Sequence, residues 1–276
     1  MGIIEAIKNG FVSIAKNMKL WFLLLVISLI VVAIGMPLLV RVFGPDIVKF
    51  GNTNLTPDQM SNLNINWLLF AVLMIFLFSI QTFVNSGILG SVKDIVKTNT
   101  VSLANFLGYC KKYFGRLILY ILVMTVAVLI LMLIAIVIFG LIGNLGKANL
   151  TLGIILGIIA GLISIFLLIL VGMYGSLVPI VIAAEDKGLG QSLTVPFKFI
   201  KEKFWPTMGL SGLLWTIIVV LMLSTRVLLL FGTNTIILIT EQVIASIINI
   251  FISLVYVSSY MYFYLGNSGM APSKES

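Results

Sequence analysis

The chain has 276 residues, of which 61% are hydrophobic and only 9% are charged, and its mean hydropathy is +1.21. This composition excludes an ordinary soluble domain. The formal net charge of +8 does not indicate nucleic-acid binding, because the basic residues flank apolar stretches and do not form a run. Histidine is absent, which removes the usual general base and a common zinc ligand. The sequence predicts a single membrane domain, 1–276, without cofactor or metal.

Six apolar stretches are each long enough to cross a hydrocarbon core about 30 Å thick, which needs about 20 residues. They cover residues 20–40, 67–89, 117–140, 152–182, 208–230 and 236–265. The first stretch is too long for the apolar part of a signal peptide, and no small-residue cleavage site follows it, so we interpret it as a retained anchor. The expected fold class is all-α: a bundle of six transmembrane helices with amphipathic helices at the membrane surface.

The distribution of lysine and arginine orients these spans. If the odd-numbered spans run outward, only Arg41, Lys49, Lys147 and Arg226 of the 17 basic residues fall on the outer side. Short cytoplasmic loops of membrane proteins carry an excess of lysine and arginine. We therefore expect a multi-pass protein of the cell membrane, with both termini in the cytoplasm and the polar segment 51–66 outside.

Three basic segments precede the odd-numbered spans and share an apolar spacing. Apolar residues at 3, 7, 11, 14 and 18 line one face of a helix, and residues 189–204 and 103–114 repeat these steps. With Ala6 aligned to Ser102 and Ser192, the offsets are 96 and 186 residues. This spacing predicts three parallel two-span repeats, 1–96, 97–186 and 187–276. The alternative is that any short cytoplasmic connector becomes amphipathic and basic.

Basic amphipathic helices beside a bilayer lie in the interface, with their lysines toward anionic head groups. The partner expected for these segments is therefore the anionic inner leaflet. The predicted lipid contacts are Lys16, Lys19, Lys111, Lys112, Arg116, Lys198, Lys201 and Lys203.

Short motifs surround the third basic segment: VIAAEDKG at 181–188, QSL at 191–193, FKFIK at 197–201 and FWP at 204–206. Together with the six spans, they resemble a broad set of uncharacterised six-span prokaryotic membrane proteins. Those proteins are related to the membrane domain fused to some glycerophosphodiester phosphodiesterases. The resemblance implies an architecture and not an activity, because the His and Glu pattern that binds metal in the phosphodiesterase domain does not occur here.

Polar residues inside the spans need partners in protein or water. The sixth span has a polar stripe that continues to Tyr256 and Tyr260, and the second span has polar residues in its inner half. Two interpretations remain open, namely contacts between helices or the lining of a polar cavity that opens inward. The candidate cavity residues are Gln81, Asn85, Gln242, Ser246, Asn249 and Ser253. Gly153, Gly157 and Gly161 of the fourth span would allow helices to approach closely.

Arg226 and Glu241 lie at similar distances before and after a short loop centred near residue 233. In an antiparallel hairpin they reach the same depth. A lone charge at the centre of a membrane helix costs about 2.5–3.5 kcal/mol, so we expect an ion pair that joins the fifth and sixth spans. The alternative role for Glu241 is a cation or proton site. Three other acids near the inner ends, Asp94, Glu185 and Asp186, are interpreted as solvated loop charges, with a cation site as the alternative.

Two functions of different classes follow. The favoured one is a non-enzymatic membrane accessory or lipid-interacting protein that uses its basic segments at the inner leaflet. The alternative is a transporter or channel for a small or amphipathic solute. An enzyme comes last, because no nucleophile–base pair or metal set is visible. The sequence indicates no particular protein partner and no nucleic acid.

Overall fold

The computed structural model describes residues 1–43, 67–227 and 235–269. Within these ranges every regular element is a helix, and six of the helices are long and apolar enough to cross a membrane. This confirms the predicted all-α class. The predicted outer segment 51–66 lies outside the described residues. The helices are α1 (Ile3–Lys16), α2 (Met18–Phe43), α4 (Trp67–Thr98), α5 (Leu103–Ala148), α6 (Leu150–Glu185), α7 (Leu189–Glu202), α8 (Phe204–Arg226) and α9 (Thr235–Asn267).

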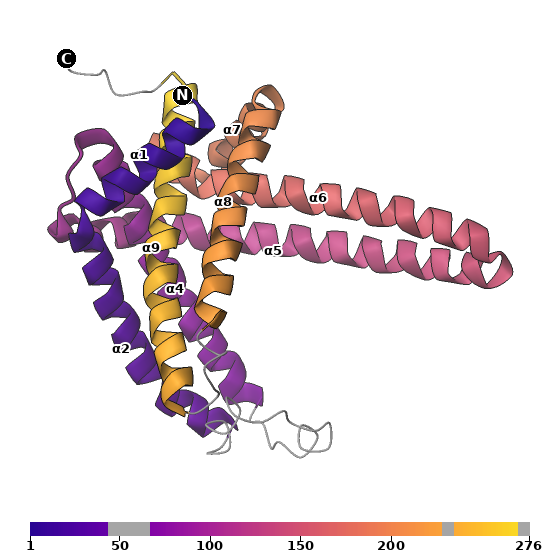
Figure 1. The fold of residues 1–276 in the computed structure, drawn as a ribbon, viewed down its shortest axis with the longest axis horizontal. Coiled ribbons are helices and arrows are strands. Elements are labelled where there is room, and N and C mark those ends of the chain that lie inside the picture. Colours follow the sequence, from indigo (N-terminus) through magenta and orange to yellow (C-terminus); the bar gives the residue numbers. More distant parts are fainter. Residues whose placement is uncertain (44–66, 228–234, 270–276) are drawn as a thin grey trace.

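The C-terminal ends of α4, α6 and α9 meet in a common apolar core, where Val92, Leu177 and Leu254 are fully buried. Each of these ends is followed by a residue in the left-handed conformation: Asn99, Asp186 and Gly269. Figure 1 shows α1, α7 and the end of α9 together at one end of the molecule. The predicted cytoplasmic ends of the spans therefore form one packed junction.

Helices α5 and α6 form a long antiparallel hairpin that projects away from the other helices, across the direction of α8 and α9 (Figure 1). With 46 residues, α5 has a length of about 69 Å at about 1.5 Å per residue. That is more than the thickness of a hydrocarbon core, which is about 30 Å. The hairpin tip is tight, because a Cβ atom on Gly153 would lie 2.5 Å from the Cα atom of Gly146.

The basic segments pack against the even-numbered spans in a cyclic order. The start of α5 lies on α4, where Gly87 adjoins Phe106. In the same way α7 lies on α6, and Tyr174 of α6 donates a hydrogen bond to the Leu193 carbonyl at 2.6 Å. Helix α1 lies on α9, so the first and last helices of the chain close the ring.

The buried residues of the three basic segments occupy equivalent positions when the segments are aligned with the offsets of 96 and 186 residues. On α1 they include Ala6, Gly10 and Ile14, and on α7 Ser192, Pro196 and Ile200 occupy the same positions 186 residues later. On α5, Phe106 and Cys110 take the places of Gly10 and Ile14 at the offset of 96. This regularity favours the predicted repeats, which stay a prediction.

The second basic segment does not form a separate interfacial helix, and that prediction was wrong. Helices α1 and α7 end at Lys16 and Glu202, and the backbone of the next residue, Asn17 or Lys203, leaves the helical conformation before the following helix begins. In contrast, α5 runs unbroken from Leu103 into its span. Its basic stretch 111–116 contains no proline, and Gly115 alone costs only about 1 kcal/mol in a helix. The packing of this half against α4 keeps it helical.

Candidate functional site

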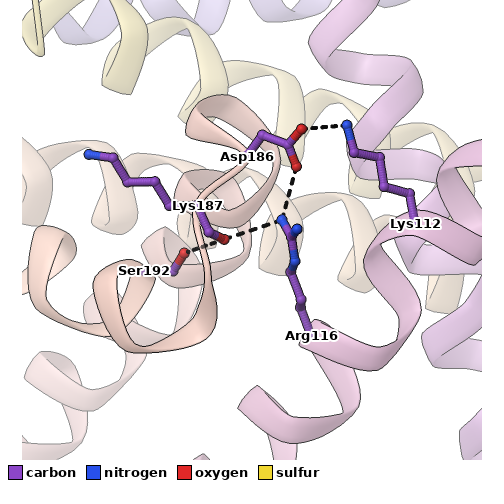
Figure 2. A network of polar contacts seen from close by, with 5 residues as sticks. All are labelled: Lys112, Arg116, Asp186, Lys187 and Ser192. Atoms are coloured by element: carbon purple, nitrogen blue, oxygen red, sulfur yellow. Dashed lines mark hydrogen bonds and ion pairs between the residues drawn. The ribbon is translucent and has the colours of Figure 1, made fainter.

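Asp186 is the centre of a polar network that joins α5 to the turn between α6 and α7 (Figure 2). Its left-handed backbone, with φ of 55°, ends α6. Lys112 donates to one carboxylate oxygen, and Arg116 donates to the other at 2.9 Å. Arg116 also donates to the Lys187 carbonyl at 3.2 Å, which accepts the Ser192 hydroxyl as well. Two cations one turn apart on α5 thus hold the start of α7 in place.

The electrostatics of this network favour an ionised Asp186. The hydrogen bond from Lys112 is the largest influence on the pKa of the Asp186 carboxyl and lowers it. Partial burial raises the pKa, but the hydrogen bond from Arg116 lowers it again, so that it lies below its ordinary value. Lys112 and Arg116 keep 46% and 34% of their side chains exposed. Both predicted lipid contacts are therefore also structural cations, and they outnumber the one carboxylate that they bind.

The other two acids have partners of their own. Glu185, with 3% of its side chain exposed, pairs with Lys187 and accepts a hydrogen bond from Tyr264 of α9. Asp94 accepts from the Tyr109 hydroxyl at 2.6 Å. The interpretation as solvated loop charges was wrong for Glu185, which is buried at the end of α6. No group of three metal-ligand side chains occurs among the residues with described positions.

The remaining predicted lipid contacts are exposed. On the same outer faces, Phe11, Leu107 and Phe197 occupy equivalent positions of the three basic segments and expose 52%, 61% and 66% of their surface. Each segment therefore presents at least one large apolar side chain together with lysine. The exposed lysines of the predicted set are Lys16, Lys19, Lys111, Lys198, Lys201 and Lys203.

The face of α1 that packs against protein includes part of the apolar stripe, since Ile14 is fully buried and Ile3 and Ile7 pack partly buried against the core. Small residues make the closest contacts: a Cβ on Gly10 would lie 2.4 Å from the Ser259 hydroxyl, and Ser13 shares a hydrogen bond with Ser258 at 3.1 Å. Small residues let two helix backbones approach closely. Of the predicted stripe, Ile14 is buried and Phe11 is largely exposed.

An apolar groove with a volume of 610 Å³ lies between the α5–α6 hairpin and α7. Met124 and Ala127 of α5 and Phe166 and Leu170 of α6 line it, and so does Lys201 of α7. This lysine is the one charged residue in the lining. The sequence named Lys201 as a lipid contact, but the groove beside it depends on a helix packing that the sequence does not reveal.

A polar pocket of 320 Å³ lies between α8 and α9, at the C-terminal end of α8, which is remote from α7. It contains the expected ion pair, with Arg226 Nη1 3.4 Å from Glu241 Oε1. The Glu241 side chain is 2% exposed and that of Arg226 is 62% exposed, so the carboxylate is buried and the guanidinium lies at the rim.

The structure separates the six candidate cavity residues. Three of them line the polar pocket: Gln242, Ser246 and Asn249. Gln81 instead donates to Asn85 at 3.3 Å within α4, and Ser253 is exposed. The pocket also lies at the predicted outer end, so it is not the inward-opening cavity that the sequence suggested.

A hydroxyl cluster in the spans was not predicted. Ser176 of α6 shares a hydrogen bond with Tyr256 at 2.6 Å, and Ser211 of α8 shares one with Tyr260. Ser176, Ser211 and Tyr260 lie on an otherwise apolar groove of 410 Å³. The polar stripe of α9 signalled the two tyrosines, but the sequence did not show which helices face them.

No family model, curated protein or solved structure matches this chain. The resemblance of the motifs at 181–206 to six-span prokaryotic membrane proteins therefore stays a prediction about architecture.

Proposed function

We propose that this protein is a non-enzymatic protein of the cell membrane that binds anionic phospholipid at the cytoplasmic leaflet. Both termini would lie on that side. The observation that carries the proposal is the repeated pairing of an exposed large apolar side chain with exposed lysine on all three basic segments. Because the segments belong to one ring of packed helices, they present these groups at one end of the molecule.

The physical basis is the combination of two weak attractions. A lysine near an anionic membrane surface contributes about 1 kcal/mol, and burying a large apolar side chain contributes about 1.5–3 kcal/mol. Phe11, Leu107 and Phe197 would enter the acyl boundary while the neighbouring lysines contact head groups. Asp186 keeps Lys112 and Arg116 oriented at the same level.

Retention of lipid by the purified protein tests this function. The protein is assembled in nanodiscs with equal amounts of phosphatidylglycerol and phosphatidylcholine and transferred into mild detergent, and the retained lipids are counted by mass spectrometry. We expect phosphatidylglycerol to be enriched. The triple change Lys16→Glu, Lys111→Glu and Lys198→Glu should reduce that enrichment at least about fivefold, at about 1 kcal/mol per lysine.

Lys147→Glu is the control, because Lys147 is exposed at the hairpin tip, far along α5 from the basic segment. It should leave the enrichment unchanged. Equal retention of the two lipids by the unmodified protein would contradict the proposed function.

The transport alternative is favoured by one observation, the buried Glu241 carboxylate in a polar pocket. Against it, fully buried Val92, Leu177 and Tyr260 fill the junction at the other end of the spans. Proton or cation flux into proteoliposomes that disappears with Glu241→Gln would favour transport over lipid binding.

A further inference from the structure

The groove between the hairpin and α7 combines a long apolar wall with a single charge. Its volume of 610 Å³ lies within the range of about 300–1,000 Å³ that is typical of small-molecule sites. Ala127 and Phe166 form part of the wall, and both belong to helices of the membrane-crossing class. In a bilayer such a space is filled by lipid.

The polar groups around the groove limit what can bind there. The Tyr174 hydroxyl already donates to the Leu193 carbonyl at 2.6 Å, so this residue contributes mainly its ring. Lys201 is exposed and is then the lining residue whose charged end can receive a ligand. A soluble polar molecule would find few partners in the groove, and a neutral apolar one would make no use of the ammonium. An acyl chain with an anionic head group matches both features.

Beside each of the other two basic segments, an aromatic side chain of the segment packs against one from a span. Phe11 packs edge-on against Phe251, with ring centroids 5.4 Å apart, and Phe114 packs in the same way against Phe83 at 5.6 Å. Beside α7, Phe204 and Phe166 are more widely spaced, at 6.3 Å, and the groove lies next to them. The groove and Lys201, which lines it, therefore occur together beside α7.

We propose that this groove binds one anionic phospholipid, with an acyl chain between α5 and α6 and the head-group phosphate on Lys201. The inference rests on the proposed function and assigns it a defined site, in addition to the general attraction of the basic segments. The lysine lies in the last turn of α7, at the predicted level of the head groups, and the apolar wall extends from there along the hairpin.

Photo-crosslinking tests the site. The probe is phosphatidylglycerol with a diazirine in the part of one acyl chain nearest the glycerol, added to nanodiscs that contain the full-length protein. Cross-links should concentrate in residues 124–127, 166–171 and 197–204. Lys201→Gln should lower their yield about fivefold, which corresponds to about 1 kcal/mol for one lysine at an anionic surface. Ala127→Trp, which fills the groove from an exposed position of α5, should lower it further.

Lys147→Gln is the matched control, because Lys147 carries the same charge, is exposed at the hairpin tip and does not line the groove. Cross-links spread evenly along the exposed hairpin, or a yield unchanged by Lys201→Gln, would overturn the groove site. If phosphatidylglycerol enrichment persisted in that case, the proposed function would stand. Equal labelling by a phosphatidylcholine probe, or stronger labelling by a diazirine fatty acid, would overturn the assignment to an anionic phospholipid.

Discussion

The α5–α6 hairpin and the α8–α9 pair are both antiparallel helix pairs, yet different contacts hold them together. Helices α8 and α9 are joined by the Arg226–Glu241 ion pair near one end and by the Ser211–Tyr260 hydrogen bond farther along. The hairpin has polar contacts around Asp186 at its base and, farther along, a hydrogen bond from the Tyr120 hydroxyl to the Gly175 carbonyl at 2.6 Å. At its tip two glycines approach closely. Between these points its apolar side chains are widely exposed.

This difference reflects how surrounding lipid alters the forces that hold helices together. Lipid tails are as apolar as leucine, so burial of leucine between helices gives little net stabilisation in a membrane. Two helices then pair specifically where polar groups form hydrogen bonds or ion pairs, or where small residues let the two backbones approach each other. The α8–α9 pair has a polar bond toward each end, whereas the middle of the hairpin relies on van der Waals packing.

The largest expected effect comes from overpacking the ring to which both pairs are attached. In Gly10→Leu the new Cβ would lie 2.4 Å from the Ser259 hydroxyl and 2.8 Å from its backbone nitrogen, so α1 must move off α9. We expect a loss of about 3 kcal/mol, measured as thermal unfolding in detergent. Gly108→Leu is the control, since no atom lies within 4 Å of its Cβ position. Equal losses in both variants would show that the contact with α9 contributes nothing specific.

The second test breaks the polar link of the α8–α9 pair. Arg226→Met leaves the buried Glu241 carboxylate without its cation, and we expect a loss of about 2 kcal/mol, below the usual value because Arg226 is largely exposed. Glu241→Gln should cost less, and the double variant should recover part of the loss. The measurement is a double-mutant cycle of thermal stability in detergent. Strictly additive losses would mean that the two residues do not interact.

A smaller effect is expected at the hairpin tip. Gly153→Leu would place its Cβ 2.5 Å from the Gly146 Cα atom and should open the tip, at a cost of about 1 kcal/mol. Spin labels on Ile138 and Ile158 would report a longer distance between the helices. Gly161→Leu, whose Cβ position has no neighbour within 4 Å, should leave that distance unchanged. An unchanged distance in Gly153→Leu would disprove the role of the glycine contact.

The smallest effect concerns the polar base of the hairpin. The folded pKa of Asp186 is lowered by Lys112 and Arg116, so its stabilisation is present above the unfolded pKa of about 3.9. It is lost as pH falls from there through the folded pKa. For this partly exposed group we expect less than about 1 kcal/mol. Asp186→Asn, which tolerates the left-handed conformation, should flatten the dependence of thermal stability on pH below 5. Parallel curves for the two proteins would contradict a stabilising ion pair.

Part of the candidate site could be predicted from the sequence. Lys201 and the other exposed lysines follow from a local helical spacing, and the Arg226–Glu241 contact follows from a short loop that brings two costly charges to one depth. In contrast, the Asp186 network joins residues about 70 positions apart, and nothing local indicates that α5 passes beside the start of α7. The polar stripe of α9 was visible, but its division between the Arg226 pocket and the hydroxyl cluster depends on which helices face it.

The sequence by itself determined the membrane class and the six spans, because transfer of about 20 consecutive apolar residues into lipid is favourable whatever they contact. The tertiary structure decided that α1, α5 and α7 pack on α9, α4 and α6. It also decided that α5 continues into its span without a break and that a groove forms at Lys201. These features depend on the shapes of surfaces distant in the chain, such as Gly10 on Ser259. In lipid, many arrangements of the helices would bury the same apolar area. The fit between helix surfaces and the pairing of polar groups therefore decide which arrangement forms.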